Sequence, residues 1–130
     1  MQRVAIAGHT GRGNYGHYLD MAFVGVEGAK IVAIADPNDA GRKAAQDRTG
    51  AKAAYADYRE MLEKERPDIT VFASREIGDH LDLVLATRDI GTHIYIEKPL
   101  AATHGEVDQM TAVCEANDSL LIVGCPWRGH

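Results

Sequence analysis

Cysteine, proline and aromatic residues are scarce in this 130-residue chain. The two cysteines, Cys114 and Cys125, are too few for a disulfide framework and have no metal-ligand spacing around them, which indicates a reducing compartment and no zinc site. No apolar run approaches the roughly 20 residues that span a bilayer, and the N-terminus leaves no room for a signal peptide. The net charge of −5 includes no basic cluster, which argues against nucleic acid as a partner. We therefore expect a cytoplasmic protein that binds neither membranes nor nucleic acids.

Short apolar runs alternate with amphipathic segments along the whole chain. The predicted strands are residues 4–7, 31–35, 53–55, 69–73, 93–96 and 120–123, and a helix is expected after each of the first five. Tyr18, Met21 and Ala22 supply the apolar stripe of the first helix. Buried strands that alternate with helices predict one α/β domain over residues 1–130, with a doubly wound, mainly parallel six-stranded sheet in the order 3-2-1-4-5-6.

Residues that favour helix ends lie between these strands. Asn38, Asp57 and Thr103 are predicted N-caps, the last two as parts of capping boxes. Gly50 and Pro67 are expected to end helices.

The first strand leads into a glycine-rich segment, residues 8–16 (GHTGRGNYG). Glycine admits positive φ and lets a phosphate approach backbone amides, and the N-terminus of a following helix stabilises negative charge. Two registers of the dinucleotide fingerprint GxGxxG fit. Residues 11–16 match it letter for letter but begin three residues after the strand, whereas residues 8–13 begin where the strand ends but carry Thr10 in place of the second glycine. We prefer the second register, because the tight turn must follow the strand. The predicted phosphate contacts are Gly8, Thr10, Gly11, Arg12 and Gly13.

Asp36 ends the second strand at about the ~20-residue spacing after the fingerprint that is expected of an acid binding the adenosine ribose. Because a carboxylate repels a 2'-phosphate, Asp36 predicts NAD rather than NADP as the cofactor. The alternative for Asp36 is a simple Asp-Pro turn. Arg42 lies nearby as a candidate for binding a 2'-phosphate, or as an ordinary solvated charge.

Residues 93–100 (HIYIEKPL) place Glu97-Lys98-Pro99 at the end of the fifth strand. Together with the glycine-rich segment, the 36–38 turn and the closing strand, they make the whole chain resemble the nucleotide-binding domain of the Gfo/Idh/MocA oxidoreductase family. The resemblance implies hydride transfer between NAD(H) and a sugar, a polyol or a similar small alcohol or carbonyl compound. Glu97-Lys98-Pro99 is its most specific element.

The resemblance makes Lys98 the predicted catalytic residue and a cofactor contact. An ammonium group at the carboxyl end of a parallel strand can stabilise charge on a reacting oxygen or relay a proton to it. Glu97 is expected to lie near the cofactor and to orient Lys98 or its turn, and Pro99 to stiffen that turn, with a cis bond as one option. The alternative for Lys98 is a surface lysine in a strand-to-helix turn.

The chain departs from the family pattern at several positions. Thr10 replaces a glycine, Ser74-Arg75 replaces the usual Thr-Pro after the fourth strand, and His80 comes about one residue late. Ser74 is still expected near the cofactor. His80 is either a site residue at the start of the next helix or a partly buried, hydrogen-bonded helix histidine. His9 either donates to a phosphate or faces solvent.

Family members continue into a second domain that supplies the substrate pocket, and we expect this chain to be the cofactor domain of such an enzyme, catalytically silent by itself. Cys125 and Trp127 would lie near the boundary between the domains. A non-catalytic NAD-binding module and the cofactor domain of an NAD-dependent lyase or glycosidase are the alternatives. Exposed sheet edges also make a homo-oligomer plausible.

Overall fold

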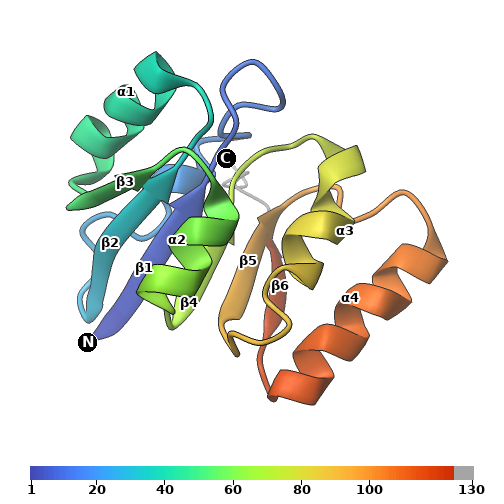
Figure 1. The fold of residues 1–130 in the computed structure, drawn as a ribbon. Coiled ribbons are helices and arrows are strands. Elements are labelled where there is room, and N and C mark those ends of the chain that lie inside the picture. The colour runs from blue at the N-terminus through green and yellow to red at the C-terminus, as the bar shows by residue number, and fades with distance from the viewer. Residues whose placement is uncertain (125–130) are drawn as a thin grey trace, which may run out of the picture.

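The computed structural model describes residues 1–124, which form a six-stranded, all-parallel sheet in the order β3-β2-β1-β4-β5-β6 (Figure 1). The strands are β1 (Gln2–Ala7), β2 (Ala29–Ala35), β3 (Ala53–Tyr55), β4 (Ile69–Phe72), β5 (His93–Glu97) and β6 (Leu121–Gly124). The predicted fold class and strand order are confirmed. Each predicted strand lies within two residues of an observed one.

Four α-helices cover the sheet, namely α1 (Asp39–Thr49), α2 (Tyr58–Glu65), α3 (Ile77–Leu85) and α4 (His104–Asn117). Side chains alternate across each strand, so Ala5 and Ala7 of β1 face α2, α3 and α4, whereas Val4 and Ile6 face the side of α1. Figure 1 shows α2, α3 and α4 in front of the sheet. The two faces therefore have separate apolar cores.

The helix ends follow from local sequence. The Asn38 side chain accepts a hydrogen bond from the Gly41 amide (2.8 Å) and begins α1, and Gly50 ends that helix with φ of 76°. Thr103 Oγ1 accepts from the Glu106 amide (3.1 Å) and begins α4. Asp57 also caps its helix, although its carboxylate accepts from the Arg59 amide rather than from residue 60.

The predicted α-helix after β1 is wrong. Only a short 3-10 turn, Leu19–Met21, forms there, and Tyr18 is 80% exposed instead of packing inward. Asn14 and Tyr18 have positive φ values of 50° and 62°, and Gly13 and Gly16 are left-handed as well. Left-handed residues at these spacings interrupt the backbone hydrogen bonds of an α-helix. No α-helix N-terminus therefore stands behind the glycine-rich segment.

The membrane expectation concerns long apolar helices. Within residues 1–124, none of the helices has the length and apolar character that crossing a membrane requires.

Candidate functional site

A cavity of about 430 Å³ lies at the carboxyl edge of the sheet, where ligands of open α/β folds bind. It is lined by Ala7, Gly8, His9 and Arg12, by Ala35, Asp36 and Pro37, by Ala56, Asp57, Tyr58 and Arg59, and by Ser74, Asp79, Asp82 and Leu83. The ends of β1, β2, β3 and β4 and the first turns of α2 and α3 thus converge on one space. Parallel strand polarity places all of these chain segments at the same edge.

Residues 8–16, here called the glycine loop, form a closed hairpin. β1 ends at Ala7, so Gly8 begins the turn, as the preferred register requires. His9 and Asn14 exchange backbone hydrogen bonds of 3.1 and 3.0 Å, and the Gly11 amide donates to Asn14 Oδ1 at 3.0 Å. Among the amides of residues 8–14, only that of Gly13 has no partner within the described part of the chain. The loop is therefore not the open cluster of free donors that the sequence suggested.

Two glycines of the loop are required for its packing. A Cβ on Gly8 would lie 2.1 Å from the Tyr15 ring. A Cβ on Gly13, whose φ is 76°, would lie 2.2 Å from Ser74 Oγ. Gly11 differs, because it has positive φ but no atom within 4 Å of its Cβ position. Gly8 and Gly13 thus leave space for the side chains of Tyr15 and Ser74, whereas Gly11 is needed only for the backbone conformation of the turn.

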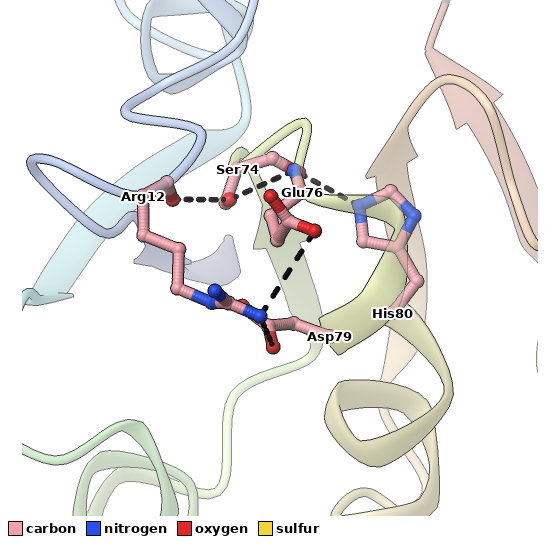
Figure 2. Close-up of polar contacts among 5 residues, drawn as sticks. All are labelled: Arg12, Ser74, Glu76, Asp79 and His80. Carbon is pink, nitrogen blue, oxygen red and sulfur yellow. Dashed lines mark hydrogen bonds and ion pairs between the residues drawn. The ribbon is translucent and has the colours of Figure 1, made fainter.

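Arg12 and Ser74 join the glycine loop to the start of α3 (Figure 2). Ser74 Oγ donates to the Arg12 carbonyl oxygen at 2.9 Å and accepts from the Glu76 amide at 3.2 Å. The Arg12 guanidinium makes a bidentate contact with Asp79, at 2.7 and 3.0 Å. This hydrogen bonding lowers the pKa of Asp79 and raises the pKa of Arg12, so both groups are charged at neutral pH. Half of the Arg12 side chain remains exposed at the cavity rim.

Asp36 is fully buried, and its carboxylate is bound by the protein itself. Oδ1 accepts from the Thr10 and Asn38 amides at 3.1 and 2.9 Å. Oδ2 accepts from the Thr10 hydroxyl at 2.6 Å and from the Tyr15 hydroxyl at 2.9 Å. Asp36 borders the cavity but has no accessible surface. The predicted ribose contact stays untested, and these bonds favour a different role.

Glu97 contacts the residue after the glycine loop rather than Lys98. Its carboxylate is fully buried, with Oε1 2.5 Å from His17 Nδ1, and it accepts from the His17 amide at 3.4 Å. Lys98 is exposed, has no side-chain partner among residues 1–124, and precedes Pro99 through a cis bond. The catalytic role of Lys98 stays a prediction. Sequence reasoning missed His17, because 80 positions separate it from Glu97.

His80 is a buried link between two turns. It is fully buried, with Nε2 2.7 Å from the Ser74 carbonyl oxygen and Nδ1 3.0 Å from that of Leu100. This agrees with the hydrogen-bonded alternative for His80. His9 is one of the residues that border the cavity. Cys125 and Trp127 lie outside the described residues.

Tyr58 and Arg59 form a cavity wall that the sequence did not reveal. The Arg59 guanidinium lies 4.6 Å from the centroid of the Tyr58 ring, and burial is the largest cause of a raised pKa for Tyr58. Both residues belong to the first turn of α2. A flat, cationic wall of this kind suits an aromatic ring.

Comparison with known proteins gives one family. A family model described as "Oxidoreductase family, NAD-binding Rossmann fold", GFO_IDH_MocA, matches residues 2–125. The chain is 27% identical over 99 residues to myo-inositol 2-dehydrogenase of Thermotoga maritima, covering 76% of this chain and 29% of that protein. It is 33% identical over 101 residues to D-xylose 1-dehydrogenase (NADP(+)) 2 of Haloferax volcanii, covering 78% of this chain and 31% of that protein.

A solved structure of an oxidoreductase from Agrobacterium radiobacter, in complex with NAD+, L-tartaric acid and magnesium, has the same fold. Its TM-score is 0.81 at 24% identity, over 94% of this chain and 34% of that one. The chain therefore spans about a third of the length of these similar proteins.

Proposed function

Because the chain belongs to the Gfo/Idh/MocA oxidoreductase family, we propose that it is the cofactor-binding part of a dehydrogenase acting on a sugar, a polyol or a similar small alcohol or carbonyl compound. The chain is an NAD-binding domain of that family. The cavity at the carboxyl ends of β1 to β4, bordered by the glycine loop, is the observation that carries it. The names of the inositol and xylose relatives support this substrate class.

The phosphate end of a dinucleotide fits the residues present. The Gly13 amide has no partner in residues 1–124, and Arg12 keeps half of its side chain exposed beside it. An amide donor and a guanidinium are both suited to phosphate oxygens. Tyr58 and Arg59 would form the wall against the adenine ring. The ribose end fits less well, because the acceptor positions of Asp36 are filled.

Lys98 would serve the reacting end. It follows β5 at the same edge of the sheet, and it is an exposed residue whose side chain has no partner in the described residues. When bound, the nicotinamide supplies the hydride donor or acceptor. Lys98 would stabilise charge on the substrate oxygen or pass a proton to it. Glu97 and His17 would fix the backbone from which Lys98 projects. The substrate pocket itself would come from a second domain.

Calorimetric titration of this chain with NADH and NADPH tests the cofactor site. We expect Arg12→Ala to weaken binding roughly tenfold or more, since it removes a charge-assisted hydrogen bond to phosphate. Lys43→Ala is the control, because Lys43 is 73% exposed on α1 and pairs only with Asp47 among the described residues. Failure of both nucleotides to bind at millimolar concentration would overturn the proposed site.

A further inference from the structure

The carboxylate at the end of β2 has no free hydrogen-bonding position. A carboxylate offers about four acceptor sites. Asp36 uses them for the Thr10 amide, the Thr10 hydroxyl, the Tyr15 hydroxyl and the Asn38 amide, at distances between 2.6 and 3.1 Å. With the side chain also fully buried, a ribose hydroxyl has neither access to it nor a lone pair to bind.

The surrounding structure is shaped to hold this arrangement. Gly41 of α1 faces the pair, and a Cβ there would lie 1.9 Å from Thr10 Oγ1 and 2.9 Å from Asp36 Oδ2. The Tyr15 ring is buried on the other side, beneath the Arg48 guanidinium at 4.7 Å. Burial and the neighbouring Asp36 raise the pKa of Tyr15, so its hydroxyl keeps its proton and remains a donor. Thr10, the residue that replaces a fingerprint glycine, therefore has a specific partner.

Arg42 offsets the charge at the same strand end. Its Nη1 donates to the Asp36 carbonyl oxygen at 2.8 Å, and its Nη2 lies 2.5 Å from Asp39 Oδ1. Only 21% of the Arg42 side chain is exposed. The buried carboxylate thus lies beside a fixed cation whose charge it shares with Asp39, and this cation reduces its repulsion of a nearby phosphate.

We propose that Asp36 is a positioning residue that fastens the glycine loop to β2 through Thr10 and Tyr15, and that it does not bind the cofactor ribose. The inference rests on the proposed function and specifies its cofactor selectivity. An acid at this strand end favours NAD(H) when it accepts from the ribose 2'-hydroxyl. The bonds from Thr10, Tyr15 and Asn38 already occupy those acceptor positions. The unmodified chain accordingly binds both nucleotides with similar affinity.

Four proteins separate positioning from ribose binding in calorimetric titrations with NADH and NADPH. The unmodified chain should bind the two within about threefold, because the hydrogen bond that would give a roughly tenfold preference is absent. Thr10→Gly uncovers Asp36 Oδ2 and should shift the affinity ratio roughly tenfold toward NADH. Thr10→Ser keeps the hydroxyl and should keep the original ratio. Asp36→Asn should change both affinities by the same factor.

The opposite pattern would overturn the inference. One such result is an unmodified chain that prefers NADH tenfold or more and loses this preference in Asp36→Asn. Another is a Thr10→Gly variant whose ratio of NADH to NADPH affinity equals that of the unmodified chain. If neither nucleotide binds, the proposed function fails, and thermal melting then decides the positioning role. Tyr15→Phe should lower Tm by roughly 5 °C or more, because it removes a buried bond to a charged group. Tyr18→Phe, at an 80% exposed residue, should not change Tm. Equal Tm values for both variants would refute the positioning role.

Discussion

Gly13→Ala tests directly how the glycine loop is packed. The added methyl carbon would lie 2.2 Å from Ser74 Oγ, 2.6 Å from the Glu76 amide nitrogen and 2.9 Å from that of Arg75. Two of these three atoms belong to the backbone of the turn after β4, so a change of side-chain rotamer cannot relieve the overlap. Either the loop or the turn must move.

Gly11→Ala is the matched control for this substitution. Gly11 and Gly13 have φ values of 89° and 76°, so alanine at either position pays a similar backbone cost of about 1 kcal/mol. Only position 13 adds steric overlap, which typically costs about 1–3 kcal/mol in packed surroundings. We expect Gly11→Ala to lower the free energy of unfolding by about 1 kcal/mol and Gly13→Ala by about 2–4 kcal/mol. A domain with about 5–15 kcal/mol of stability remains folded in both cases.

Urea unfolding followed by circular dichroism measures the difference between the two variants. With a slope of about 1–3 kcal/mol per molar urea, the Gly13→Ala midpoint should fall below that of Gly11→Ala by roughly 0.3–3 M. Equal midpoints for the two alanine variants would show that residue 13 is not packed against the turn.

Three further predictions concern single side chains. Because Arg12 lowers the pKa of Asp79, their contact stabilises the folded state above the ordinary carboxyl pKa, and this stabilisation is lost as the pH falls through the lowered pKa. Asp79→Asn should therefore lower Tm slightly at pH 7 and leave Tm unchanged in strong acid. A Tm difference that persists in strong acid would contradict this. The Tyr55 hydroxyl donates to Glu65 Oε2 at 2.5 Å, which raises the pKa of Tyr55 to about 12. In an ultraviolet pH titration of Glu65→Gln, the pKa of one tyrosine should therefore fall toward about 10. A titration curve identical to that of the unmodified chain would reject the assignment. Lys98→Ala should leave NADH affinity within about threefold, because its proposed role is at the reacting oxygen, and should abolish turnover in a protein that includes the substrate domain; full activity would exclude a catalytic role.

Sequence alone predicted the sheet because each strand carries its own signal. A run such as 69–73 is apolar on both faces, which is what a parallel sheet between two helical layers requires. Gly50 and Asn38 mark the ends of α1 through contacts within a few residues. Connection rules then leave little freedom in strand order. All of this information is local or topological.

The segment after β1 shows where local reasoning fails. The spacing of Tyr18, Met21 and Ala22 fits a helix, but left-handed residues at Asn14 and Tyr18 exclude one, and nothing in the apolar pattern reports φ. The site was harder still. Asp36 had the spacing of a ribose-binding acid, yet its partners are 21 and 26 positions away, and pairings of that kind follow from the finished fold.

The glycine loop touches three strand ends that are distant in sequence. It contacts Asp36 after β2, Ser74 after β4 and, through His17, Glu97 at the end of β5. The longest of these links closes 80 positions, and closing long loops costs entropy that only an assembled sheet offsets. We therefore expect the loop to order late in folding, after the strands it joins. A nucleotide bound at the proposed site would stabilise the native state over any form in which the loop is not ordered.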